Sequence, residues 1–62
     1  MTEMELRVLA ALRQLNQELG RVFSYDVAEE IEKTARTARY HLNKLLEAGR
    51  VEYSRGRGWV AA

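Results

Sequence analysis

The spacing of apolar residues changes at Gly49, and this change constrains the fold more than any other feature of the chain. Before Gly49, apolar residues recur every three or four positions, as in amphipathic helices. After it, apolar and polar residues alternate, which is typical of strands. The alternating apolar positions are Val51, Tyr53, Trp59 and Ala61. With 62 residues and no cysteine, the chain must rely on an apolar core without disulfides. We expect one mainly α-helical domain over residues 1–62 that ends in a small β-hairpin.

The first apolar stripe predicts a helix over residues 3–19. Thr2 and Glu5 have the spacing of a capping box at its start, and Gly20 stands where a left-handed C-terminal cap belongs. The stripe consists of Met4, Val8, Leu9, Leu12, Leu15 and Leu19. Leu6 lies off the stripe, either as a lone exposed leucine or as part of a partner contact.

Two shorter helices are expected next. Residues 21–23 are β-prone and predict a short edge strand, after which Ser24 is expected to cap a helix over residues 25–32. Its apolar stripe is Val27, Ala28 and Ile31. Thr34 is then expected to cap a helix over residues 35–48, which Gly49 ends. The apolar stripe of that helix is Ala38, Leu42, Leu45 and Leu46.

The C-terminal residues predict a hairpin over residues 50–61. Two β-prone runs flank Arg55-Gly56-Arg57-Gly58, and two glycines between such runs are typical of a turn. Trp59 and Tyr53 are expected to form its apolar face, packed on the third helix. The predicted order is therefore helix, strand, helix, helix and two-stranded hairpin, or α-β-α-α-β-β.

Charge is divided unevenly along the chain. Residues 1–32 carry seven acidic and three basic side chains, and residues 33–62 carry two acidic and seven basic ones. The two halves thus have net charges of −4 and +5, with His41 counted as neutral. This asymmetry is consistent either with an oriented contact to a polyanion or with an ordinary mixed surface.

Two stretches carry a family resemblance: FSYDVAEEI at residues 23–31 and TARTARYHLNKLLEAGRV at residues 34–51. They resemble the winged helix-turn-helix pattern of ArsR-like and MarR-like repressors and of the small fimbrial phase-variation regulators. The resemblance implies a DNA-binding domain whose third helix enters the major groove. The sequence departs from the pattern in the turn at residues 32–34, which lacks the usual glycine. It also has no cysteine pair or histidine cluster, so we expect no metal, and His41 is expected to be structural or to face a phosphate.

The third helix supplies the candidate DNA contacts. Helical spacing turns Ala35 and four larger residues away from the apolar stripe. Arginine can donate two hydrogen bonds to guanine, and asparagine can pair with adenine. The predicted base-reading residues are Arg36, Arg39, Tyr40 and Asn43. The predicted phosphate and wing contacts are Ser24, Tyr25, Thr34, Thr37, Lys44, Arg55 and Arg57. Alternatively, these are solvated polar residues, and Thr34 is only a cap.

The sequence therefore predicts a sequence-specific double-stranded DNA-binding protein, a transcriptional regulator. We expect it in the cytoplasm, associated with the nucleoid if prokaryotic, without a cofactor, a metal or a membrane span. Helix 3–19 is the candidate surface for a homodimer. The alternative is a winged-helix protein-interaction module, which is favoured if acidic side chains interrupt the basic face. Catalysis is not expected, because the chain has one histidine, no cysteine and no glycine-rich phosphate loop.

Overall fold

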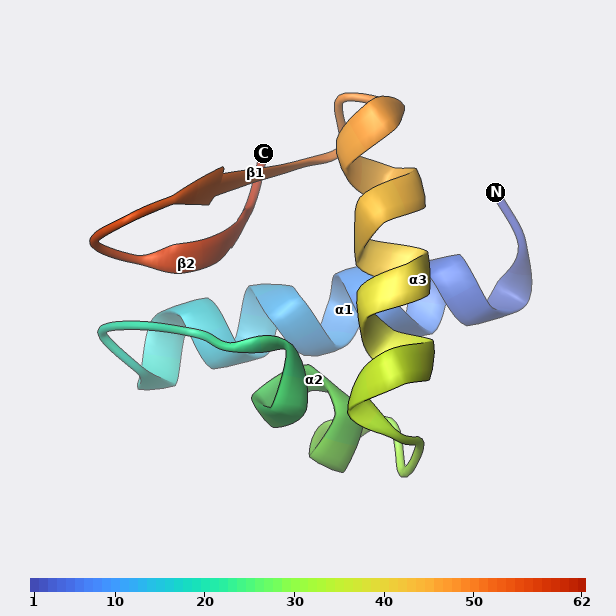
Figure 1. Cartoon of the computed structure of the whole chain (residues 1–62), viewed down its shortest axis with the longest axis horizontal. Helices are drawn as coiled ribbons and strands as arrows, with labels where there is room; N and C mark the ends of the chain where they lie inside the picture. Colours follow the sequence, from blue (N-terminus) through green and yellow to red (C-terminus); the bar gives the residue numbers. More distant parts are fainter.

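The computed structural model describes all residues, 1–62, as three helices followed by an antiparallel hairpin (Figure 1). The elements are α1 (Glu3–Glu18), α2 (Ser24–Glu30), α3 (Ala35–Glu47), β1 (Val51–Ser54) and β2 (Gly58–Ala61). In Figure 1, α3 crosses in front of α1, α2 packs beside the first half of α3, and the hairpin extends from the other end of α3. The mainly α-helical order with a C-terminal hairpin is therefore confirmed. None of the helices has the length and hydrophobicity needed to cross a membrane.

Local capping chemistry sets most helix ends. The Thr2 hydroxyl accepts the Glu5 N–H at 3.2 Å and the Glu5 carboxylate accepts the Thr2 N–H at 2.8 Å, which confirms the predicted capping box. Thr34 caps α3 in the predicted way by accepting the Thr37 N–H at 3.2 Å. Gly49 adopts the expected left-handed backbone, with a φ of 74°. The prediction for Gly20 is wrong: α1 ends through Leu19, which has an extended backbone, and Gly20 has no positive φ.

The boundaries of α2 differ from the prediction at both ends. Ser24 is the first helical residue and not the cap, because the cap position is Phe23, whose N–H donates to the Asp26 carboxylate at 2.8 Å. The helix ends at Glu30, two residues early. Glu32 then takes a left-handed conformation with a φ of 59°. A glutamate thus occupies the backbone conformation that glycine adopts most easily.

The strand predicted over residues 21–23 is reduced to one residue. Val22 forms an isolated parallel bridge with Gly58. Its N–H donates to the Arg57 carbonyl and its carbonyl accepts the Trp59 N–H, both at 3.0 Å. The regular sheet therefore has two strands, with Val51 opposite Ala61 and Tyr53 opposite Trp59. The bridge fixes the hairpin to the segment that links α1 and α2.

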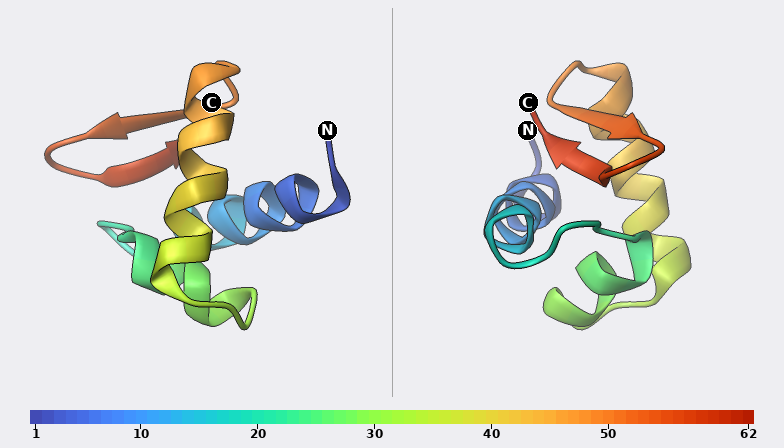
Figure 2. Two further views of the ribbon diagram at one scale, coloured as in Figure 1. Left: turned by 45° about the vertical axis from the view of Figure 1, so that its right-hand side comes forward. Right: turned by 90° about the vertical axis from the view of Figure 1, so that its left-hand side faces the viewer.

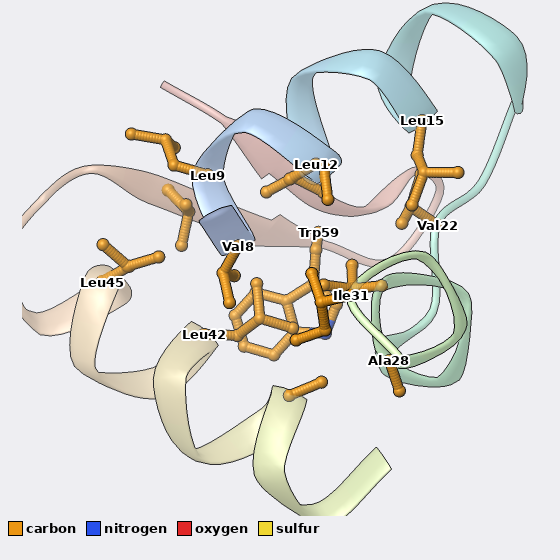
Figure 3. Close-up of a cluster of buried hydrophobic side chains, with 14 residues drawn as sticks. Val8, Leu9, Leu12, Leu15, Val22, Ala28, Ile31, Leu42, Leu45 and Trp59 are labelled. Atoms are coloured by element: carbon orange, nitrogen blue, oxygen red, sulfur yellow. The ribbon is translucent and has the colours of Figure 1, made fainter. Parts of the chain in front are cut away.

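A single cluster of buried apolar side chains joins all five elements (Figure 3). In Figure 3, Trp59 of the hairpin lies among Leu42 of α3 and Val8 and Leu12 of α1. The complete cluster is Val8, Leu9, Ala11, Leu12, Leu15, Val22, Val27, Ala28, Ile31, Ala38, Leu42, Leu45, Val51 and Trp59. Three predicted core positions are wrong, because Leu19, Leu46 and Tyr53 are exposed. Tyr53 still contacts the Trp59 ring edge-on, with ring centroids 4.9 Å apart.

A polar side chain fastens α1 to the hairpin. Asn16 donates from Nδ2 to the Trp59 carbonyl and accepts the Ala61 N–H at Oδ1, each at 2.9 Å. The amide thereby pairs with the edge of β2 that β1 leaves free, much as another strand would. This contact and the Val22 bridge hold the hairpin beside α1.

Candidate nucleic-acid interface

The side of α3 that faces away from the core carries polar and aromatic residues. Because Ala38 and Leu42 are fully buried, a period of 3.6 places Arg36, Tyr40 and Asn43 on the opposite side. All three are exposed, and Arg39 is exposed as well. None of the four side chains takes part in an intramolecular hydrogen bond. Their donors are therefore free to bind a ligand.

The first turn of α3 departs in part from the prediction. Ala35, which was expected to face outward, is half-buried and packs against the core. The Thr34 hydroxyl accepts the Thr37 N–H and donates to the Thr37 hydroxyl at 3.1 Å. Its hydrogen is thus already used, which leaves Thr37 as the better phosphate donor of the pair.

Lys44 lies on the α1 flank of α3 and not on its outward stripe. The hydrogen bond from the Thr2 backbone lowers the pKa of Glu5 in α1, and the positive charge of Lys44 contributes in the same direction. The ammonium also lies 5.4 Å from the centre of the Tyr40 ring. His41 is half-buried on this flank, with its Nδ1 atom buried and without a hydrogen-bond partner. Lys44 therefore lies beside the outward stripe of α3, and its phosphate contact stays a prediction.

The hairpin turn presents the second basic group. Arg55 and Arg57 are both exposed. The turn is held from two sides, since the Arg21 guanidinium donates to the Arg55 carbonyl and the Ser54 hydroxyl accepts the Arg57 N–H at 3.0 Å. In the right-hand view of Figure 2, the turn and α3 both lie on the side of the molecule away from α1. The hairpin turn and α3 are therefore two separate candidate contact surfaces on the same side of the molecule.

The start of α2 carries an exposed aromatic stack. Tyr25 lies parallel to Phe23, with ring centroids 5.3 Å apart and an angle of 6° between the planes. The Arg21 guanidinium lies 4.9 Å from the Phe23 centroid. Ser24 is half-buried. Tyr25 was a predicted DNA contact, whereas Arg21 and Phe23 were not, although their alternation about the buried Val22 indicates that both face outward.

One acidic residue interrupts the outward stripe of α3. Glu47 follows Asn43 by one turn and is exposed. The basic part of the face is therefore the N-terminal half of α3. The surface has no enclosed pocket and no group of three histidine, cysteine or carboxylate side chains arranged to hold a metal ion.

Comparisons with protein-family models, curated proteins and solved structures found no match to this chain. The chemistry of the exposed side chains therefore carries the functional argument.

Proposed function

We propose that this protein binds duplex DNA as a winged helix-turn-helix domain and regulates transcription in the cytoplasm. The observation that carries the proposal is the free, exposed set Arg36, Arg39, Tyr40 and Asn43 on the outward side of α3. A helix about 10–12 Å wide fits a major groove about 12 Å wide. The unpaired guanidinium groups suit guanine edges, and the Asn43 amide suits adenine.

The hairpin turn would supply a second contact. The hairpin turn that carries Arg55 and Arg57 lies on the same side of the molecule as α3 in the right-hand view of Figure 2. From there the two arginines can reach the adjacent minor groove or its phosphates. Thr37 and Lys44 supply further phosphate contacts beside the helix. These contacts carry little sequence information, so they are expected to set affinity and orientation while Arg36 and Arg39 set specificity.

Selection from a pool of random duplexes at two salt concentrations tests this function. The selected pool should contain a short motif, and binding should weaken steeply as salt rises, because basic side chains displace counterions. Arg39→Ala should relax the motif at one position and weaken binding by about 1–3 kcal/mol. Arg13→Ala, which removes the same charge from an exposed position on α1, serves as the matched control and should retain the motif.

A protein-interaction role is the second candidate, and Glu47 is the observation that favours it. The Glu47 carboxylate lies one turn after Asn43 and would repel the DNA phosphates if the DNA contacted the whole length of α3. If wild-type protein binds no duplex even at low salt, the DNA proposal fails and the interaction role takes its place.

A further inference from the structure

Three planar side chains gather beside the hairpin turn. Arg21 lies against the Phe23 ring, and Phe23 stacks on Tyr25 in a nearly parallel arrangement. Both aromatic residues are large apolar groups left in solvent, with exposed fractions of 39% for Phe23 and 59% for Tyr25. The core does not use them, so their exposure has no packing explanation.

The stack is fixed in place relative to the arginines of the turn. Arg21 donates to the Arg55 carbonyl, and Val22, between Arg21 and Phe23, pairs through its N–H with the Arg57 carbonyl. Both bonds join the stack segment to the hairpin turn. The stacked rings therefore lie on a segment that is hydrogen-bonded to the backbone of the turn that carries Arg55 and Arg57.

This combination is the one that single-stranded nucleic acids require. Such sites pair a positively charged track for the phosphates with aromatic rings on which bases stack. A duplex interior offers no free base face to a ring, whereas an unpaired base exposes both of its faces. An acidic peptide would satisfy the arginines but would leave the parallel rings without a planar partner.

We propose that the Phe23–Tyr25 stack, together with Arg21 and the adjoining turn that carries Arg55 and Arg57, binds unpaired nucleobases of single-stranded DNA. A base stacks on the Tyr25 ring while the arginines of the turn contact its flanking phosphates. The site shares Arg55 and Arg57 with the proposed duplex interface but does not need α3. It also gives Tyr25 a role through its ring in place of the phosphate contact expected from the sequence.

Fluorescence anisotropy with two labelled strands of equal charge tests the proposal. One is an oligothymidine of about 12 nucleotides, which spans a typical single-strand site. The other has the same length and phosphates, but every base is replaced by an abasic linker. Wild-type protein should bind the thymidine strand at least about fivefold more tightly, because stacking one base contributes that much or more. Equal affinity for the two strands would overturn the proposal.

Substitutions test whether the aromatic rings cause the preference for the thymidine strand over the abasic strand. Tyr25→Leu should remove it and Phe23→Leu should reduce it, whereas Tyr25→Phe should retain it because the ring remains. Tyr53→Leu is the matched control, since Tyr53 is a comparably exposed tyrosine outside the stack, and it should keep the preference. Circular dichroism verifies that each variant is folded. A preference that survives in folded Tyr25→Leu would also overturn the proposal.

Binding to a blunt duplex, measured separately, distinguishes the single-strand proposal from the proposed function. Arg39→Ala should weaken binding to a blunt duplex and leave the ratio between thymidine and abasic strands unchanged. If duplex binding is lost in every condition while the base preference persists, only the duplex function fails. If the protein binds neither strand but binds an acidic peptide, the stack is a peptide site and the single-strand proposal is wrong.

Discussion

Replacing Gly58 with alanine is expected to destabilise the protein more than a methyl group added at any other glycine. Gly58 has a φ of 71°, and a Cβ built on it would overlap the carbonyl oxygen of Val22. That carbonyl accepts the Trp59 N–H within the bridge that fixes the hairpin. The added methyl group and the bridge cannot occupy the same space.

The magnitude follows from three costs. A left-handed backbone costs a non-glycine residue about 1–2 kcal/mol. Separating Val22 from the hairpin breaks two hydrogen bonds, at about 1 kcal/mol each. Val22 is fully buried, so its freed polar groups add a further penalty of about 1 kcal/mol or more. The total is about 4–5 kcal/mol, against an expected stability of about 3–9 kcal/mol for a chain of this size.

Alanine substitutions at two other glycines distinguish the cost of the left-handed backbone from the cost of breaking the Val22 bridge. Gly49 has a φ of 74° but nothing within 4 Å of a built Cβ, and Gly56 has neither the strain nor the contact. Gly49→Ala should therefore cost about 1–2 kcal/mol, and Gly56→Ala less than about 0.5 kcal/mol. Urea denaturation followed by Trp59 fluorescence and by circular dichroism measures all three variants. If Gly58→Ala loses no more stability than Gly49→Ala, the bridge does not hold the hairpin and the reasoning is wrong.

Three further predictions concern stability. Asn16→Ala should cost about 2–3 kcal/mol in urea denaturation because it removes both bonds to β2; Gln17→Ala, at an exposed position, is its control, and equal losses would contradict the assignment. Glu32→Gly should raise the free energy of unfolding by up to about 1 kcal/mol by relieving the left-handed strain, so a destabilised variant would refute that strain. Because the folded-state pKa of Glu5 is lowered from 4.5, its contribution to stability is complete above that value and lost as pH falls through the folded-state pKa. The thermal midpoint of Glu5→Gln should consequently fall less than that of wild type between about pH 7 and pH 3, and an identical fall would argue against this linkage.

The fold was predictable where neighbours in sequence decide the structure. The pairs Thr2 with Glu5 and Thr34 with Thr37 are three residues apart, and both caps form as expected. At α2, the Asp26 carboxylate accepts the Phe23 N–H, as the third residue of a capping box does when Phe23 is the cap. The helix accordingly begins one residue earlier than predicted.

Contacts between residues distant in sequence could not be predicted. The bond from Asn16 to Trp59 and Ala61 spans more than 40 residues, and nothing near Asn16 marks it as different from the exposed polar residues of α1. The bridge to Gly58 likewise decides how much of residues 21–23 can be a strand. Leu46 was wrongly included in the apolar stripe of α3. It directly follows the buried Leu45, and consecutive residues lie about 100° apart around a helix, so Leu46 is exposed.

The candidate site also has features that the sequence predicted and features that it could not predict. Helical phase correctly predicted that Arg36, Arg39, Tyr40 and Asn43 would be exposed, but it placed the half-buried Ala35 among them. Phase cannot reveal that the Thr34 hydroxyl is already engaged, that Lys44 lies toward Glu5, or that Phe23 and Tyr25 stack. Each of these depends on side-chain geometry in the folded chain.

Titration of isotope-labelled protein with a short duplex, followed by amide chemical shifts at low salt, tests the central claim most directly. The amides of residues 36–43 and of the turn at residues 55–58 should shift together in proportion to bound DNA, while the outward residues of α1 should not move. Raising the salt concentration should reverse the shifts. Shifts confined to α1, or no shifts at all in low salt, would contradict the assignment of α3 and the hairpin turn as the DNA-binding surface.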